Sequence, residues 1–225
     1  MKMRRPPGTV EETEKVREEG MALSKKLRDA GIKSSWPEQE THPEWLEVDR
    51  LWRESDRLSG YFRLNIWGMS KARDELTHAG VIHWSVPSPD WPEHPSELPD
   101  DVHCDIERGP DGLETGKHII STYDPETGDD IFFLLPDELI PVGDAYVAAM
   151  TETRDGTHEF PGIPGYKLGS NDGWLVQPLE ITSGIKAADK LNPKWRDGLS
   201  DYVLRFVEYM EAAVPAEGLG GFRVW

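Results

Sequence analysis

The chain has 225 residues and a formal net charge of −17, with 37% of its residues hydrophobic and 30% charged. This length suits one large domain, or one domain with a substantial insertion, and nine Trp, six Tyr and six Phe are enough to fill a core. The acidity disfavours nucleic acids and anionic membranes as partners, and no apolar run is long enough to span a membrane. The single cysteine favours a reducing compartment. We expect a soluble, cytoplasmic protein.

The negative charge is concentrated in one segment. Residues 87–160 contain nineteen Asp or Glu against three Lys or Arg, a net charge of −16, whereas residues 1–36 have a net charge of +3. A charge distribution this uneven attracts cations and basic surfaces. It therefore restricts the partners without identifying a reaction.

Two helices with capping signals are expected near the N-terminus. Thr9 and Glu12 have the spacing of a capping box, and Gly31 is placed to end the helix that they begin. A second box, Thr41 with Glu44, predicts a helix that Gly60 ends. The residues expected on one face of this second helix are Trp45, Val48, Trp52 and Ser55.

A strand, a short helix and a second strand are expected between residues 61 and 86. Residues 61–67 alternate at a period of two, which is typical of a strand. Ser70 suits the cap of a helix that Gly80 closes, and residues 81–86 have the composition of another strand. The pairing of the two strands is left open, because their connection is near the lower limit for a parallel pair.

The acidic segment is expected to begin with a loop and to contain a hairpin. Five prolines between residues 87 and 99 exclude a regular helix or a central strand. Two apolar runs, 117–123 and 131–135, flank a turn rich in Asp, Pro and Gly, which favours a β-hairpin. Residues 145–150 fit either a helix or a strand.

The last third gives the clearest signals. Residues 174–176 predict a short strand, and Pro178 suits the first position of a helix. Asn192 and Pro193 predict the start of another helix, whose apolar residues recur at helical spacing as far as Met210 and mark it as a core element. Residues 220–225 have the pattern of a terminal strand.

Together these elements predict an α+β fold, with a mixed or mostly antiparallel sheet covered by helices and an acidic, proline-rich insertion. We expect an N-terminal helical segment, residues 1–36, and then a single α+β domain, residues 37–225. The acidic loop and hairpin region of that domain covers residues 87–160.

Residue spacing gives little support to a metal site. The histidines and Cys104 lack the paired spacing of zinc ligands. Asp124, Glu126, Asp129 and Asp130 crowd one turn and offer oxygen ligands for Ca²⁺, but their spacing does not match an EF-hand loop. A solvated turn is the better interpretation, and we expect no metal and no cofactor.

No activated nucleophile is evident from the sequence. Cys104 follows His103, but adjacent residues of an extended chain point to opposite sides, and the local acidity disfavours a thiolate. Ser170 is not part of a G-x-S-x-G sequence, so a turn that contains a hydroxyl is the better interpretation. The catalytic residues stay unidentified, and the sequence leans away from an enzyme.

Residues 162–176, GIPGYKLGSNDGWLV, are followed by Pro178, and the chain closes with GGFRV at residues 220–224. These two stretches resemble uncharacterised proteins of actinobacteria and their phages. The resemblance covers roughly the last third of the chain. It implies neither a reaction nor catalytic residues.

Two functions of different class fit these observations. The first is a non-enzymatic interaction protein, of immunity, antitoxin or anti-defence type, that binds a basic protein through an acidic surface. The residues expected on this surface are Asp100, Asp101, Asp105, Glu107, Asp124, Glu126, Asp129 and Asp130. Trp36, Trp84 and Trp91 lie beside prolines or loop signals and fit either an exposed binding surface or a core.

The alternative is an enzyme or small-molecule binder with a pocket near residues 162–174. Backbone rich in Gly, Asn and Asp brings amide groups close to a ligand. The residues expected in this loop are Tyr166, Ser170, Asn171, Asp172 and Trp174. A third interpretation is that the acidity serves solubility alone.

Overall fold

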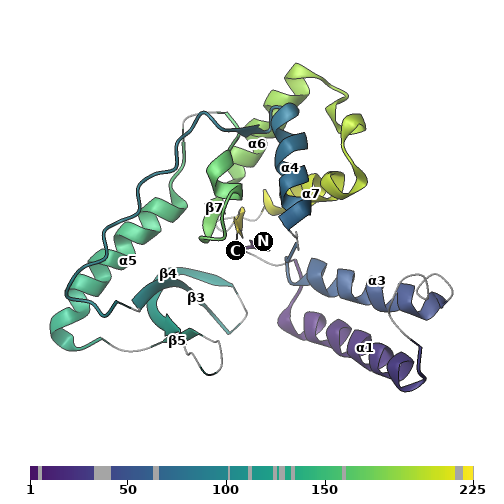
Figure 1. Ribbon diagram of the computed structural model, residues 1–225, viewed down its shortest axis with the longest axis horizontal. Coiled ribbons are helices and arrows are strands. Elements are labelled where there is room, and N and C mark those ends of the chain that lie inside the picture. Colours follow the sequence, from purple (N-terminus) through teal and green to yellow (C-terminus); the bar gives the residue numbers. More distant parts are fainter. Residues whose placement is uncertain are drawn as a thin grey trace.

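The computed structural model describes residues 1–4, 7–32, 42–62, 66–100, 102–110, 113–123, 126, 130–132, 135–158, 161–215 and 220–224 (Figure 1). The helices are α1 (Val10–Asp29), α3 (Pro43–Leu58), α4 (Ile66–His78), α5 (Ile140–Asp155), α6 (Pro178–Leu191) and α7 (Asp201–Ala213). Short 3₁₀ turns lie at Asp137–Leu139, Gly165–Leu168 and Trp195–Gly198. The strands are β1 (Lys2–Met3), β2 (Ile82–His83), β3 (Val102–Arg108), β4 (Glu114–Tyr123), β5 (Asp130–Phe132), β6 (Ile163–Pro164), β7 (Trp174–Val176) and β8 (Phe222–Val224).

In the part of the chain that the structure describes, the strands form three small sheets. β1, β8 and β7 form one antiparallel sheet in that order, and β3, β4 and β5 form another. β2 and β6 form a parallel pair in which Ile82 is opposite Ile163. The α+β class and the mostly antiparallel pairing are confirmed, although the strands are divided among three sheets.

The main core lies in a body formed by the β1–β8–β7 sheet, the β2–β6 pair and helices α4, α6 and α7 (Figure 1). The apolar stripe of α7 is fully buried there, as its spacing predicts, through Val203, Phe206, Val207 and Met210. Each large apolar side chain that is removed from water in this way stabilises the fold by roughly 1.5–3 kcal/mol. The body therefore supplies most of the apolar burial.

Helices α1 and α3 pack against each other and extend from the body as a helical hairpin (Figure 1). Their contact contains a small cluster of Leu27, Trp45 and Val48. The predicted capping box at Thr9 is confirmed, because the Thr9 hydroxyl accepts from the Glu12 amide while the Glu12 carboxylate accepts from the Thr9 amide. α1 lies within the N-terminal segment that was expected to end at residue 36, and it packs on α3, which lies beyond that boundary.

Three helices end at the glycines that the sequence indicates. Gly31, Gly60 and Gly80 have φ angles of 74°, 65° and 81°, which a residue with a Cβ adopts only at a cost. In each case the glycine amide donates to the carbonyl three residues earlier, and the next amide donates to the carbonyl five residues before it. This pattern is a Schellman motif, and it satisfies the last carbonyls of the helix.

The acidic segment folds as a separate lobe, which we define as residues 87–158. Residues 87–95 have no regular structure, in agreement with the prediction from the prolines. The expected hairpin is confirmed as β4 and β5, to which β3 adds a third strand. Residues 145–150 lie in α5, which packs against β3 and β4 over a small core of Leu98, Val102 and Ile120.

Several element boundaries differ from those predicted. The strand expected at residues 61–67 is wrong at its end, because α4 already begins at Ile66, before Ser70. The strand expected at residues 81–86 is reduced to Ile82–His83. Apolar alternation over so few residues is also compatible with the first turn of a helix, and the tertiary contacts decide between a strand and a helix.

The start and the buried face of α3 also differ. Its N-cap is His42, which makes no side-chain capping bond, and Pro43 takes the first helical position. The box expected from Thr41 is therefore not the cap, and Thr41 itself lies outside the described residues. Leu51 occupies the buried position expected for Trp52, whose side chain is 37% exposed.

The last helix begins later than predicted. Asn192 and Pro193 precede the 3₁₀ turn Trp195–Gly198, and α7 starts at Asp201 after the N-cap Ser200. The Asn192 side chain accepts from the Lys194 amide at 3.0 Å, a local turn that competes with helix capping.

Candidate functional site

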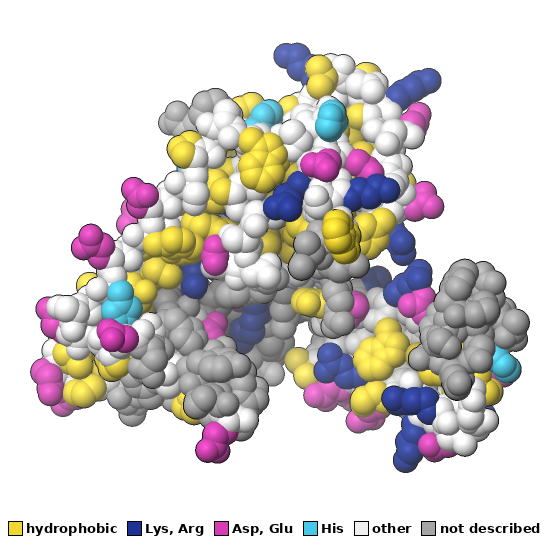
Figure 2. Space-filling view, viewed as in Figure 1, with side chains coloured by type: hydrophobic (Ala, Val, Ile, Leu, Met, Phe, Trp, Pro, Cys, Tyr) yellow, Lys and Arg dark blue, Asp and Glu magenta, His cyan; other side chains and the backbone are white. Residues whose placement is uncertain are grey.

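The surface of the acidic lobe carries many carboxylates that project into solvent. Figure 2 shows Asp and Glu side chains along the outer edge of the lobe that contains α5, with Lys and Arg only near its junction with the body. The exposed carboxylates among the described residues are Asp90, Glu93, Glu97, Asp100, Glu126, Asp137, Glu138, Asp144 and Glu152. The described surface of the lobe is therefore rich in negative charge.

The residues predicted for the acidic surface have different positions. Asp100 and Glu126 are exposed, whereas Asp105 and Glu107 are half-buried. The Glu107 carboxylate accepts from the Thr115 hydroxyl at 2.6 Å. Asp101, Asp124 and Asp129 and the side chain of Asp130 lie outside the described part of the lobe. Residues 87–99, which we call the proline segment, and α5 carry exposed carboxylates that we did not single out from the sequence and that contribute much of this surface.

The two basic side chains of the lobe that the structure describes, Arg108 and Arg154, do little to neutralise this surface. Arg154 is 8% exposed, and its guanidinium carbon lies 5.8 Å from the centre of the Trp91 ring. Arg108 is half-buried and bonds to Glu114 at 3.1 Å. Among the lobe side chains that the structure describes, no Lys or Arg is exposed. Within the described part of the lobe, the field of the exposed carboxylates therefore acts outward.

A groove of about 460 Å³ separates the proline segment from α5. Pro92 and Pro95 form one wall, and Val142, Ala145 and Ala149 form the other, with Tyr146 and Pro141 completing the apolar lining. Glu93 contributes a carboxylate to the lining. Figure 2 shows hydrophobic side chains gathered over this part of the lobe, with Asp and Glu on either side.

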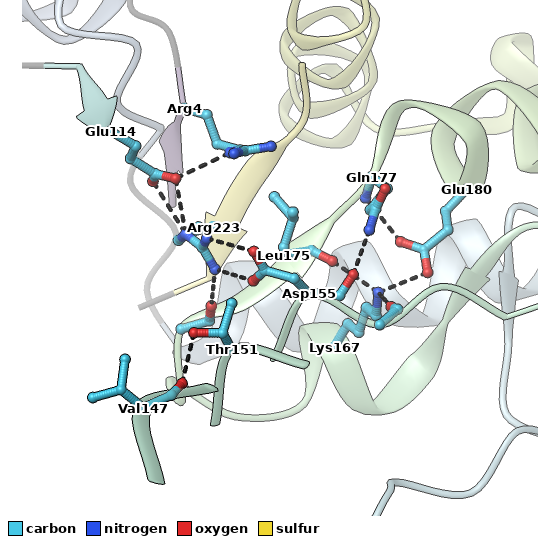
Figure 3. Close-up of polar contacts among 12 residues, drawn as sticks. Arg4, Glu114, Val147, Thr151, Asp155, Lys167, Leu175, Gln177, Glu180 and Arg223 are labelled. Carbon is cyan, nitrogen blue, oxygen red and sulfur yellow. Dashed lines mark hydrogen bonds and ion pairs between the residues drawn. The ribbon is translucent and has the colours of Figure 1, made fainter. Parts of the chain in front are cut away.

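The lobe is joined to the body by the buried carboxylate of Glu114, and Figure 3 shows its contacts with Arg4 and Arg223. Glu114, on β4, is 3% exposed and bonds to Arg4 at 3.0 Å, to Arg108 at 3.1 Å and to Arg223 at 3.1 Å. Arg223 comes from β8, so this contact crosses from one sheet to another. Charge-assisted bonds of this kind are stronger than neutral ones, and they fix the position of the lobe.

Arg223 also holds the C-terminal end of α5. It makes a two-pronged contact with the Asp155 carboxylate at 2.8 and 3.1 Å, and it donates to the Gly173 carbonyl at 3.0 Å. Burial opposes the charge on Arg223, but the Asp155 and Glu114 carboxylates more than compensate, and the pKa of the guanidinium is raised. This side chain is a structural cation with all its partners in place.

Lys167 and Glu180 form a second buried pair (Figure 3). The Lys167 Nζ donates to the Glu180 Oε1 at 2.7 Å and to the carbonyls of Gly156 and Leu175 at 2.7 and 2.8 Å. Glu180 also accepts from the Gln177 amide, in a capping box that begins α6. Burial lowers the pKa of Lys167 and raises the pKa of Glu180, while the attraction between them acts in the opposite direction on both.

We did not anticipate these buried ion pairs from the sequence. The spacing Gln177-x-x-Glu180 is a local capping signal that was available. An arginine between Phe222 and Val224 in a buried strand was a second signal, because a charge buried in a strand requires a partner. The sequence does not indicate the partners, which lie 13 residues away for Lys167 and Glu180, 68 for Arg223 and Asp155 and 109 for Arg223 and Glu114.

The loop predicted for a small ligand makes many contacts within the protein. Tyr166 shares a hydrogen bond of 2.6 Å with His158, and Trp174, which is 1% exposed, donates to the Ser170 hydroxyl at 3.0 Å. Asn171 and Asp172 are exposed. Burial and the Glu180 charge raise the pKa of the Tyr166 hydroxyl, which stays protonated at neutral pH.

Burial, together with the charge of Lys167, lowers the pKa of His158 from its ordinary value of 6.5. Its partner Tyr166 packs edge-on against Trp174, which in turn contacts Trp91 of the proline segment at 4.6 Å between ring centres. These aromatic rings therefore connect the body with the acidic lobe.

Of the tryptophans that the sequence suggested for a binding surface, Trp84 and Trp91 are exposed in the structure. Trp84 is 52% exposed and Trp91 is 39% exposed, and Trp67, which we did not single out, is 83% exposed. Trp36 lies outside the described residues. The Trp84 ring lies against Gly165, where a Cβ atom would approach it to 2.4 Å. A steric requirement therefore explains one of the glycines in this loop.

A second hollow, also of about 460 Å³, lies between the C-terminal half of α4 and the turn after α6. Its polar residues include Glu75, which accepts from the Ser200 amide at 2.8 Å and so begins α7.

Among the described residues, no group of three or more His, Cys, Asp or Glu is placed to hold a metal ion. None of the described helices is both long and apolar enough to cross a membrane.

Comparison with family models, curated proteins and solved structures gives no match to this chain.

Proposed function

We propose that the protein is a non-enzymatic interaction protein that binds a basic protein through the exposed face of the acidic lobe. The observation that carries this proposal is the set of exposed carboxylates on residues 87–158, which no exposed Lys or Arg accompanies among the described side chains of the lobe. Charged groups that stabilise the fold are buried and paired elsewhere in the chain, as in the contact between Lys167 and Glu180.

Electrostatic complementarity gives such a surface a clear physical role. Opposite potentials speed the association of two proteins and make the rate strongly dependent on ionic strength, while like-charged surfaces are rejected. An acidic surface of this kind suits a protein that covers the basic substrate-binding face of a nucleic-acid enzyme. A role of immunity, antitoxin or anti-defence type is therefore part of the proposal.

The test is affinity capture from a lysate of the native host, with the full chain as bait, at about 50 mM and about 300 mM salt. We expect a basic protein that is retained at the lower salt concentration and released at the higher one. Mass spectrometry would identify this partner. Retention that salt leaves unchanged would contradict an electrostatic mode of binding.

Two variants with the same change in net charge distinguish binding by the lobe from binding by the rest of the chain. The first carries Glu93→Gln, Glu138→Gln, Asp144→Asn and Glu152→Gln on the lobe. The second carries Glu14→Gln, Glu18→Gln, Glu19→Gln and Glu208→Gln on the exposed faces of α1 and α7. We expect the first variant to lose the partner and the second to retain it. Equal loss in both would show that only the net charge matters, and no specific partner at either salt would favour the small-molecule loop at residues 162–174.

A further inference from the structure

We infer that the groove between the proline segment and α5 binds an amphipathic helix of the partner, with apolar residues at its centre and a Lys or Arg near each end. This inference rests on the proposed function and specifies the chemistry of its binding site. It follows from the order of side chains along α5, the chemistry of the proline segment and the charge of the rim.

The first observation is a stripe on the outer face of α5. Pro141, Ala145 and Ala149 follow one another at a spacing of four residues and line the groove. Glu138, in the 3₁₀ turn that leads into α5, lies three residues before this stripe, and Glu152, in α5, lies three residues after it; both are exposed. Residues at these spacings lie on one side of a helix. The stripe is therefore apolar at its centre and acidic at both ends.

The length of the stripe determines the size of the partner segment. From residue 138 to residue 152 the rise is roughly 22 Å, at about 2 Å per residue in the 3₁₀ turn and 1.5 Å per residue in α5. A helix of about 15 residues spans this distance, with apolar side chains on one face and cations near the two ends. The small side chains of Ala145 and Ala149 leave room for larger apolar side chains of the partner.

The opposite wall of the groove favours a helix over an added strand. An extended peptide docks by hydrogen bonding to the backbone of a receptor edge. Pro92 and Pro95 have no amide hydrogen, and residues 87–95 pair with no strand. Docking must then depend on side chains, which is how a helix binds in a groove. Glu93 provides a further carboxylate on this wall for a cation of the partner.

The test uses a fluorescein-labelled helical peptide of about 16 residues, with leucines on one face and an arginine pair near each end. A second peptide of identical composition has its leucines distributed around the helix. Fluorescence anisotropy measures the affinity of the full chain for both peptides at about 50 mM and about 300 mM salt. We expect the patterned peptide to bind about tenfold more tightly than the scrambled one, with a clear weakening at the higher salt concentration.

Variants of the chain locate the binding site. Glu138→Gln with Glu152→Gln, at the two ends of the stripe, is expected to weaken binding of the patterned peptide about tenfold. Asp100→Asn with Glu126→Gln makes the same change in charge away from α5 and is expected to weaken it less than about twofold. Ala145→Gln with Ala149→Gln keeps good helix formers on α5 and leaves the charge unchanged. This variant is expected to bind the patterned peptide only as tightly as it binds the scrambled one. Circular dichroism would check that each variant is folded.

The outcomes separate this inference from the proposed function. Equal, salt-sensitive affinity for the two peptides would overturn the groove site while leaving a general acidic binding surface in place. Equal loss of binding in the two charge pairs would overturn it as well. If neither peptide binds, the helix site is excluded, and the capture experiment decides separately whether the acidic lobe binds a basic protein.

Discussion

The body and the acidic lobe use the same charged residue types in opposite ways. In the body and at its junction with the lobe, Lys167, Glu180 and Arg223 are almost fully buried, and each has several hydrogen-bond partners. On the lobe, carboxylates such as Asp144 and Glu152 project into solvent. The comparison shows that the position of a charge, more than its number, separates charges paired within the fold from charges that face solvent.

Energetics explain this division. A buried charge loses its hydration, so it is tolerated only where an opposite charge and hydrogen bonds replace the water. An exposed carboxylate keeps its hydration and contributes little to stability, but it remains available to a partner. Four substitutions or sets of substitutions sharpen this contrast, and they are taken from the largest expected effect to the smallest.

Lys167→Met should have the largest effect. It removes the cation from a buried pair and leaves the Glu180 carboxylate without compensation, which costs about 3–5 kcal/mol of the free energy of unfolding. Lys186→Met, on the exposed face of the same helix as Glu180, should change it by less than about 0.5 kcal/mol. Urea denaturation measures both values. A cost below about 1 kcal/mol for Lys167→Met would show that the pair contributes little to stability.

Asp155→Asn compares the two uses of charge within one helix. Asp155 holds the buried Arg223, so loss of its charge should cost about 2 kcal/mol. Glu152→Gln, three residues earlier in α5 and exposed, should cost nothing measurable. Similar losses in the two variants would contradict the distinction between lobe surface and junction.

His158 predicts a pH dependence of intermediate size. Its pKa in the folded protein lies below 6.5, so below that pH the unfolded chain binds more protons than the folded one. The stabilising contribution is present above pH 6.5 and is lost as the pH falls through the folded-state pKa. We expect this loss to be smaller than the cost of Asp155→Asn and to be absent in His158→Gln. Titration of the His158 ring by NMR at or above pH 6.5 would refute the assignment.

Neutralising exposed carboxylates of the lobe should have the smallest effect on stability. Asp144→Asn with Glu152→Gln lowers the repulsion among like charges, and Glu152 also lies near the negative end of the α5 dipole. We expect the free energy of unfolding to rise by a few tenths of a kcal/mol at low salt, and the gain to vanish at about 300 mM salt. A decrease at either salt concentration would indicate that these carboxylates have partners in the folded protein.

Local signals in the sequence predicted local structure. The helix ends at Gly31, Gly60 and Gly80 depend on a positive φ angle, which is a local property of the chain and needs no contact with distant residues. The start of α7 was misplaced because Asn192 makes a turn with Lys194 in preference to a helix cap. The first turn of α4 was missed because the short alternation that includes Ile66 fits a strand equally well.

Non-local contacts could not be predicted in the same way. The pairing of Ile82 with Ile163 joins residues whose patterns carry no information about each other. The same is true of Glu114, whose three arginines come from β3, from the N-terminal residues and from β8. The excess of acidic residues in residues 87–160 was visible from the sequence, but the groove and the ordered stripe along α5 depend on the fold.

The most direct test of the central claim is partner capture by the lobe variant with Glu93→Gln, Glu138→Gln, Asp144→Asn and Glu152→Gln, measured together with its free energy of unfolding. We predict that this variant keeps the stability of the wild type, or gains slightly, and no longer retains the basic partner at about 50 mM salt. Full retention of the partner, accompanied by a loss of about 2 kcal/mol or more in stability, would contradict the account, because the lobe carboxylates would then be structural.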